Sequence, residues 1–289
     1  AGEAAAGLRA SPSRSGRIAQ RFCVLRQQGR AAFVPYLTAG HPSIDATLAL
    51  CRMLEEEGAD VIELGLPFTD PIADGPTNQR AAQRALDAGV RTADVLGVVR
   101  KLRSDAFELP LVLFTYWNPL RALLARSGGY AALAGLDGVL VTDLPPEEAA
   151  DHIAACRSAG IDTIFLVAPT TPDDRLPRVI AATRGFLYVV SSKGVTGARS
   201  VLPPELPELL RRVRGASGDL PIAVGFGIAN RPTAAAVAEA ADGFVVGSAL
   251  ADVVERAMDE GVDVVEAARA FVRAVDPRGP KGPRSARQI

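Results

Sequence analysis

The sequence has few of the residues that build metal centres, disulfide frameworks or histidine-dependent active sites. Its 289 residues include three cysteines and two histidines, and no cysteine pair shows a C-x-x-C spacing. A disulfide-stapled fold and a cysteine-bound metal are therefore disfavoured. His41 and His152 lie far apart in the sequence, which disfavours a catalytic zinc or a Ser–His–Asp triad. Acid–base chemistry would therefore fall to carboxylates, tyrosine or lysine.

The chain also lacks an excess of either charge. Lys and Arg number 32 against 33 Asp and Glu, for a formal net charge of −1. No basic field attracts nucleic acid, and no apolar run approaches the ~20 residues that span a bilayer. We expect no nucleic-acid or membrane partner and a cytoplasmic location. Residues 1–16 are expected to be a disordered tail; if they were instead a transit-peptide remnant, the location would be a plastid.

Hydrophobic residues make up 48% of the chain and gather in eight nearly continuous apolar runs. Such runs are typical of parallel strands covered on both faces. Helical patterns separate them; Ser43, for example, is placed to cap a helix. Eight strands, each followed by a helix, predict an α/β fold, a single-domain (β/α)8 TIM barrel. The predicted strands are 32–39, 60–65, 109–117, 138–143, 163–169, 185–191, 221–227 and 243–249.

Further helical segments add to this repeat. An N-terminal helix is expected from Arg17, because Ile18, Phe22 and Leu25 fall on one face. Residues 119–136 predict an extra helix after the third strand, and 251–260 and 264–275 predict two helices after the eighth. The barrel domain is therefore assigned to 17–276. The remaining residues, 277–289, are too rich in proline and glycine to pack and are expected to form a disordered tail.

The segment VIELGLPFTDPIADGPTNQ, residues 61–79, carries the strongest functional signal. Glu63 interrupts an apolar run, where a carboxylate is costly to bury. The loop that follows contains three prolines, which stiffen it, and the acids Asp70 and Asp74. Active sites of these barrels lie at the carboxyl ends of the strands. We therefore expect Glu63 and Asp74 to belong to an active site.

Glycines at the ends of the seventh and eighth strands indicate an anion site. The sequence there reads Val224-Gly225-Phe226-Gly227 and Val246-Gly247-Ser248. Glycines let backbone N–H groups approach a phosphate closely, and a helix beginning after Gly247 would point its dipole at the same spot. The alternative is that these glycines only form tight turns. The loop 191–199 has the glycine spacing of a lid, or of an ordinary surface connection.

These motifs together resemble the tryptophan synthase alpha chain family. The segment ELGLPFTDPIADGP (63–76) is similar to its signature, and five shorter segments follow the family's order over about residues 20–275. They are FVPYLTAGHP (33–42), VTDLPPEE (141–148), GVTGAR (194–199), VGFGI (224–228) and VGSA (246–249). The resemblance implies a lyase of tryptophan biosynthesis that cleaves indole-3-glycerol phosphate to indole and glyceraldehyde 3-phosphate, with no metal or organic cofactor.

The resemblance also implies roles for individual residues. Burial would raise the pKa of Glu63, which suits it to carry a proton, while Asp74 would accept the indole N–H and Tyr188 would complete the catalytic set. Tyr36, Phe114, Leu140 and Phe226 would enclose the indole, Thr196 would reach Asp74 from the lid, and Gly197, Gly227, Gly247 and Ser248 would hold the phosphate. A beta chain would dock on the loops bearing Asp70, Pro71 and Asn118, giving an α2β2 complex.

Three other interpretations stay open at this point. A Schiff-base aldolase would use Lys193, although such a lysine usually projects from within a strand rather than from a lid. A non-catalytic regulatory subunit would bind a phosphorylated ligand and activate a partner, although the presence of both Glu63 and Asp74 argues against lost catalysis. A free-standing lyase of the same chemistry would release indole to solvent.

Overall fold

The computed structural model describes residues 16–190, 203–225 and 227–279. The predicted N-terminal tail lies outside this range except for Gly16, and so do residues 280–289 of the predicted C-terminal tail. The proposed lid, with Lys193, Thr196 and Gly197, also lies outside the described residues, as does Phe226.

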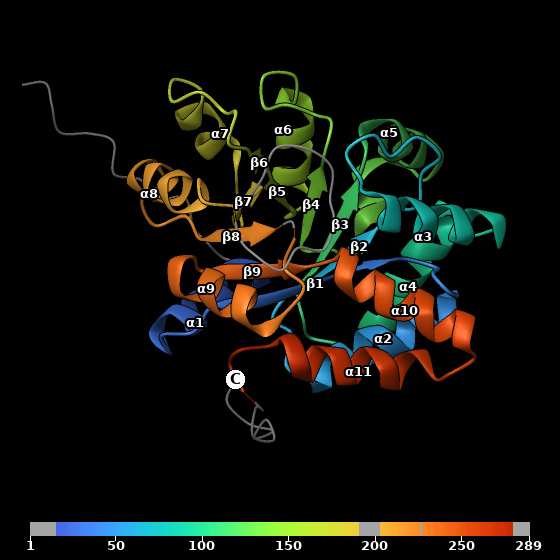
Figure 1. Ribbon diagram of the computed structural model, residues 1–289. Helices are drawn as coiled ribbons and strands as arrows, with labels where there is room; N and C mark the ends of the chain where they lie inside the picture. The colour runs from blue at the N-terminus through green and yellow to red at the C-terminus, as the bar shows by residue number, and fades with distance from the viewer. Residues whose placement is uncertain (1–15, 191–202, 226, 280–289) are drawn as a thin grey trace, which may run out of the picture.

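Nine short parallel strands form a single sheet in the described part of the chain, in the order β5-β4-β3-β2-β1-β9-β8-β7-β6 (Figure 1). Almost every strand residue is buried, as the continuous apolar runs predict. The strands are β1 (Ala32–Thr38), β2 (Ile62–Gly65), β3 (Leu111–Thr115), β4 (Gly138–Val141), β5 (Asp162–Ile164), β6 (Leu166–Val167), β7 (Leu187–Val190), β8 (Ile222–Gly225) and β9 (Gly243–Val246).

The sheet closes into a ring at the predicted fifth strand. The run predicted at 163–169 is divided into β5, which pairs with β4, and β6, which pairs with β7. Only Phe165 separates the two, and its carbonyl accepts a hydrogen bond from the Tyr188 N–H at 3.1 Å. One stretch of chain therefore joins both edges of the sheet, and the predicted TIM barrel is confirmed.

Helices surround the strands, with α11 beside α10 and α2 (Figure 1). No helix in the described ranges is long and apolar enough to cross a membrane. The helices are α1 (Arg17–Gln27), α2 (Ile44–Glu56), α3 (Pro76–Asp87), α4 (Thr92–Ser104), α5 (Trp117–Arg126), the 3-10 helix η1 (Gly129–Leu133), α6 (Ala150–Ser158), α7 (Leu176–Ala182), α8 (Leu206–Ser217), α9 (Arg231–Ala240), α10 (Ser248–Glu260) and α11 (Val264–Val275).

Local signals explain where several helices begin, and they correct some predicted boundaries. Ser43 caps α2 as expected, its hydroxyl accepting from the Ala46 N–H at 3.0 Å. The predicted third strand is too long, because Trp117 already starts α5 and the Asp143 carboxylate accepts its N–H. The connection after β3 holds α5 and, as its additional element, the short η1, whereas the unpredicted extra helix is α3, after β2.

Side chains in this barrel form two apolar layers. One lies between the strands and the surrounding helices and includes Ile62 and Leu64 of β2. The other fills the barrel interior and includes Val61, Val112 and Phe186. Successive strand residues point to opposite faces, so every second residue of a strand enters the interior. The apolar face predicted for α1 belongs to this interior layer and covers one end of the barrel.

The packed domain extends past the predicted boundary at residue 276. The Arg278 side chain is 6% exposed and pairs with Asp276 at 2.7 Å and with the fully buried Asp60. Its guanidinium also lies over the rings of Phe33 and Phe244, 5.5 and 5.6 Å from their centroids. The Pro and Gly content of the tail gave no sign of this anchor, because its partners come from distant parts of the sequence.

Replacing Arg278 with Ala is expected to lower the free energy of unfolding by about 2 to 4 kcal/mol, because it leaves the buried Asp60 with fewer cationic partners. Urea denaturation of the full chain measures the change. Arg211→Ala is the matched control: Arg211 pairs with Glu208 but is 72% exposed, so its loss should cost less than about 1 kcal/mol. Equal effects of the two changes would show that Arg278 does not anchor the chain end.

Candidate active site

The alternation of side chains along β2 places Glu63 inside the barrel. Glu63 stands opposite Tyr36 of β1 and Val112 of β3 in the sheet register and shares the inward direction of Val61. It is completely buried, and neither carboxyl oxygen has a hydrogen-bond partner among the described residues. Burial raises the pKa of Glu63 to about 8. The Glu63 side chain is therefore mainly a neutral, protonated carboxylic acid at physiological pH.

Asp74 is buried at the end of the loop that connects β2 to α3. The Tyr116 hydroxyl donates to Asp74 Oδ2 at 2.8 Å and accepts the Ala73 N–H at 3.0 Å. Burial raises the pKa of Asp74, and hydrogen bonds from Tyr116 and Asn78 oppose that rise. The Gln79 side chain donates to the Asp74 carbonyl at 2.9 Å and helps fix the loop. Asp74 is thus held in place as a hydrogen-bond acceptor.

Glu63 and Asp74 line the same cavity at the carboxyl ends of the strands. It has a volume of about 30 Å³, so a ring-sized ligand enters only if side chains of the wall move. Tyr36, Phe114 and Tyr188 contribute aromatic faces to it, with Phe114 edge-on to both tyrosines. The cavity is lined by Tyr36, Glu63, Asp74, Asn78, Phe114, Tyr188, Gly227, Ile228, Val245, Gly247 and Ser248.

Two strand-end glycines make room for the tyrosine rings. A β-carbon at Gly65 would lie 2.1 Å from the Tyr36 hydroxyl, and one at Gly225 would lie 1.9 Å from the Tyr188 hydroxyl. Real side chains do not approach so closely, so each tyrosine can occupy its position only because its neighbour is a glycine. Burial raises the pKa of both tyrosines above their ordinary value, so both stay neutral.

The predicted anion site adjoins the same cavity. Gly227 has φ +89°, a backbone conformation that favours glycine, and it lines the cavity together with Gly247 and Ser248. Helix α10 begins at Ser248, so its first N–H groups and the positive end of its dipole are at this wall. Of the described residues, no cluster of three or more His, Cys, Asp and Glu is arranged to hold a metal ion.

The structure brings together most of the residues singled out from the sequence. Leu140 is fully buried in the interior layer and does not line the cavity. Asp70 and Asn118 are exposed and Pro71 is half-buried, away from the cavity wall. The sequence reasoning missed Tyr116 and Asn78, which hold Asp74. Asn78 stands four residues after Asp74 at the start of a helix, which was a usable signal, but nothing local pointed to Tyr116.

The raised pKa of Glu63 makes stability depend on pH in a defined direction. Between pH 4.5 and about 8 the folded chain keeps a proton on Glu63 that the unfolded chain releases, so stability falls as the pH rises. Glu63→Gln removes this dependence. We expect the stability of the variant relative to the parent to increase by up to about 2 to 3 kcal/mol between about pH 5.5 and 7.5.

Urea denaturation at the two pH values measures this difference, and the difference between pH values cancels any constant cost of the amide. Glu260→Gln, at the exposed end of α10, is the control for loss of a surface glutamate. A pH-independent difference for Glu63→Gln would mean that Glu63 ionises as an ordinary glutamate.

Known proteins are similar in sequence to most of this chain. The family model described as tryptophan synthase alpha chain matches residues 22–277. The tryptophan synthase alpha chain of Roseiflexus castenholzii is 48% identical over 89% of this chain and 98% of its own length. That of Opitutus terrae is 48% identical over 81% of this chain and 88% of its own.

Solved structures agree. A chain of the Mycobacterium tuberculosis tryptophan synthase is 40% identical, with a TM-score of 0.78 over 89% of this chain and 95% of that one. The Legionella pneumophila tryptophan synthase alpha chain is 36% identical, with a TM-score of 0.80 over 89% and 94%. The match covers the barrel with Glu63, Asp74 and the glycines of the predicted anion site, and the chain therefore belongs to the tryptophan synthase alpha chain family.

Proposed function

We propose that the chain cleaves indole-3-glycerol phosphate to indole and glyceraldehyde 3-phosphate as the alpha subunit of tryptophan synthase. One observation carries the proposal: a buried acid that stays protonated, Glu63, shares a cavity with a fixed acceptor, Asp74, and with the glycines of the predicted anion site. A retro-aldol cleavage of a phosphorylated indole needs these three functions in one place. Membership of the family supports the same reaction.

Glu63 would move the proton in both directions. It first donates its proton to indole C3, which makes that carbon a leaving group and places positive charge on the ring. The bond between C3 and the side-chain carbinol carbon then breaks, and its electron pair restores the aromatic indole. The carbinol hydroxyl loses its proton to the Glu63 carboxylate as it becomes the aldehyde. Glu63 ends the cycle protonated, so protons and electrons balance.

Asp74 and the anion site would orient the substrate for this step. Asp74 accepts the indole N–H and so stabilises the positive charge that develops on the protonated ring. Tyr116 keeps the Asp74 carboxylate at its position. Gly227, Gly247 and Ser248 offer backbone N–H groups to the phosphate at the start of α10. Tyr36, Phe114 and Tyr188 would enclose the indole ring, with Tyr188 close to the acid.

Glu63→Gln is expected to lower kcat by a factor of ~10² to 10⁴ and to change KM only a few-fold, because the amide keeps the shape but cannot deliver the proton. A spectrophotometric indole-release assay measures both constants. Gly247→Val is the contrasting variant: its side chain obstructs the phosphate, so KM should rise more than kcat falls. Wild-type turnover by Glu63→Gln would remove the assignment, and no turnover by the parent chain would favour a non-catalytic phospholigand-binding subunit.

We also propose that the exposed loop before Asp74 docks a beta chain, and membership of the tryptophan synthase alpha chain family supports this proposal. Ile72 on this loop is 77% exposed, an unusual position for a large apolar side chain next to an active site. Tyr116 connects the loop to the second proposed contact, because it precedes α5, which carries Asn118, while its hydroxyl binds Ala73 and Asp74. A partner that contacts either loop would therefore act on Asp74.

Asp70→Ala is expected to leave intrinsic cleavage within about two-fold of the parent and to weaken activation by the beta chain, because Asp70 lies on the docking loop and outside the cavity. The measurement titrates beta chain into each protein while following loss of indole-3-glycerol phosphate. Asp87→Ala, an equally exposed acid at the far end of α3, is the control. If parent and variant respond alike, or neither responds, the chain is better described as a free-standing lyase.

A further inference from the structure

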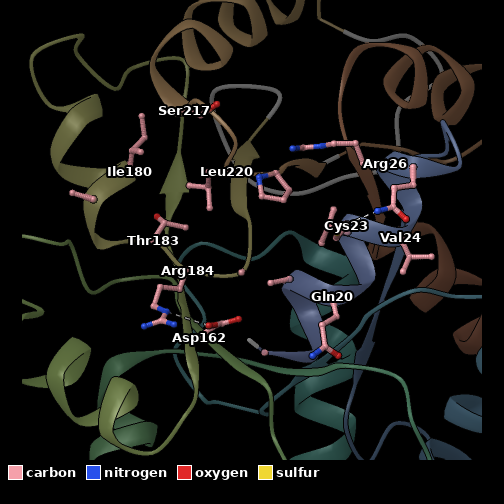
Figure 2. A pocket seen from close by; sticks show the side chains of 17 residues that line it. Gln20, Cys23, Val24, Arg26, Asp162, Ile180, Thr183, Arg184, Ser217 and Leu220 are labelled. Carbon is pink, nitrogen blue, oxygen red and sulfur yellow. Dashed lines mark hydrogen bonds and ion pairs between the residues drawn. The ribbon is translucent and has the colours of Figure 1, made fainter. Parts of the chain in front are cut away.

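A second and larger cavity lies at the opposite end of the barrel from Glu63. Its volume is about 640 Å³, within the range of small-molecule sites. Helix α1 forms one wall, and the other walls are the starts of β5, β7 and β8 and the ends of α7 and α8 (Figure 2). Because the strands are parallel, these starts are all at the amino end of the barrel, so an occupant would not compete with a substrate at Glu63.

Most of the cavity surface is apolar and built from rigid elements. Phe22 of α1 reaches it from the interior layer, where its ring contacts Phe186 at 5.6 Å between centroids. Ile180 of α7 and Leu220 and Pro221, which precede β8, complete the apolar lining. Such a surface favours a flat, largely apolar ligand, since burial of apolar area is the main gain available.

One buried carboxylate faces this apolar space. Asp162, the first residue of β5, is 8% exposed, and burial raises its pKa to about 6. Figure 2 shows its carboxylate directed toward α1, which carries Gln20 and Cys23, with Arg184 on its other side. Oδ2 lies beside Gly16 and Gly185, where β-carbons would be 3.2 Å away, so the two glycines leave this oxygen approachable.

The charges around the cavity select against an ionic ligand. Arg184 Nε is 3.5 Å from Asp162 Oδ1, which makes the pair nearly neutral together. Arg26 is also on the wall, where it pairs with Asp242 at 3.8 Å and donates to the Asp219 carbonyl. Each of these charged groups already has an oppositely charged partner, so the wall offers no unpaired charge to an ionic ligand. A neutral N–H donor can still hydrogen-bond to Asp162 without bringing a further charge into the cavity.

We propose that this cavity, bounded by α1 and the amino ends of β5, β7 and β8, is a binding site for a neutral aromatic N-heterocycle. Its rings lie against Phe22, Ile180 and Leu220, and its one N–H donates to Asp162 Oδ2. The inference is independent of the reaction at Glu63, because it rests on residues at the other end of the barrel.

Cys23 provides a local measurement of occupancy. It lies on the α1 wall and is exposed, whereas Cys51 and Cys156 are buried and burial raises their pKa to about 12. The rate of Cys23 alkylation by iodoacetamide, followed by mass spectrometry of the intact chain, should fall when the cavity is filled. With indole as the probe, nine non-hydrogen atoms imply a Kd of about 1 mM, so about 1 mM indole should halve the rate.

Two comparisons test the hydrogen bond to Asp162. 1-Methylindole has the same rings without the N–H and should protect Cys23 at least about five-fold more weakly than indole. Asp162→Asn, with folding verified by circular dichroism, should weaken protection by indole. Equal protection by both compounds in the parent chain overturns the proposal whether or not the variant folds. So does an unchanged alkylation rate up to the solubility limit of indole.

Two controls support the interpretation that a filled cavity protects Cys23. The first tests for a general effect of indole on thiols, and the second tests whether residues 1–15 occupy the cavity. Val262→Cys in a Cys23→Ser background places a thiol at a position 50% exposed on the loop after α10, and indole should not slow its alkylation. Residues 1–15 precede Gly16 at the cavity rim, so a chain without them should bind indole as the parent does. If removing them instead speeds Cys23 alkylation in the absence of probe, the chain's own segment is the occupant and the proposal fails.

The result does not depend on the proposed function, although indole is the product named there. A chain carrying Glu63→Gln should still show protection of Cys23 by indole, because Glu63 and Cys23 are at opposite ends of the barrel. If this variant loses cleavage but indole still protects Cys23, binding in the cavity is independent of the reaction at Glu63. The two proposals can therefore fail separately.

Discussion

The structure depends on one geometric constraint, which is the closure of a parallel sheet into a ring. In a closed ring every second strand residue points into a common interior with little access for water. All strands therefore contribute to the size and polarity of that interior. In this chain β5 and β6 complete the ring within one short stretch of sequence. The positions of Glu63 and of the strand-end glycines at the carboxyl ends of the strands depend on that closure.

The closed interior explains why a single glutamate acquires unusual chemistry. A carboxyl group on an open sheet edge would be hydrated and ionised, whereas Glu63 is surrounded by aromatic rings and has no hydrogen-bond partner among the described residues. Because the carboxyl group keeps its proton, no charge has to be buried. Burial also raises the pKa of Asp74, but hydrogen bonds from Tyr116 and Asn78 to its carboxylate oppose that rise. The two carboxyl groups of one cavity therefore differ in their hydrogen-bond partners.

The two ends of the barrel have different characters. At the carboxyl ends the glycines Gly65 and Gly225 let tyrosine rings fill most of the space, and the cavity that remains is narrow. At the amino ends α1 covers the interior with Ile18, Phe22 and Leu25, but it leaves a wide cavity along its side. The anchor at Arg278 ties the chain end to Asp60, which also accepts from Arg21 of α1 at 2.9 Å. The covering helix and the chain end therefore share one buried carboxylate.

The sequence by itself determined the class of fold and the identity of the central acids. Apolar runs of strand length, separated by capped helices, specify a barrel because only strands buried on both faces tolerate such runs. Glu63 was evident because a carboxylate within such a run is costly, and the glycines after the seventh and eighth strands were evident because they permit close backbone approach. The division of the fifth strand, the extra helix α3 and the buried anchor at Arg278 were not evident from the sequence. Only the tertiary structure decided how these parts meet, because the deciding contacts join residues distant in sequence: Tyr116 is bound to Asp74 across 42 positions, and Arg278 to Asp60 across 218. Local patterns encode burial and backbone conformation, but they carry no information about which distant side chain will complete a hydrogen bond or fill a given space.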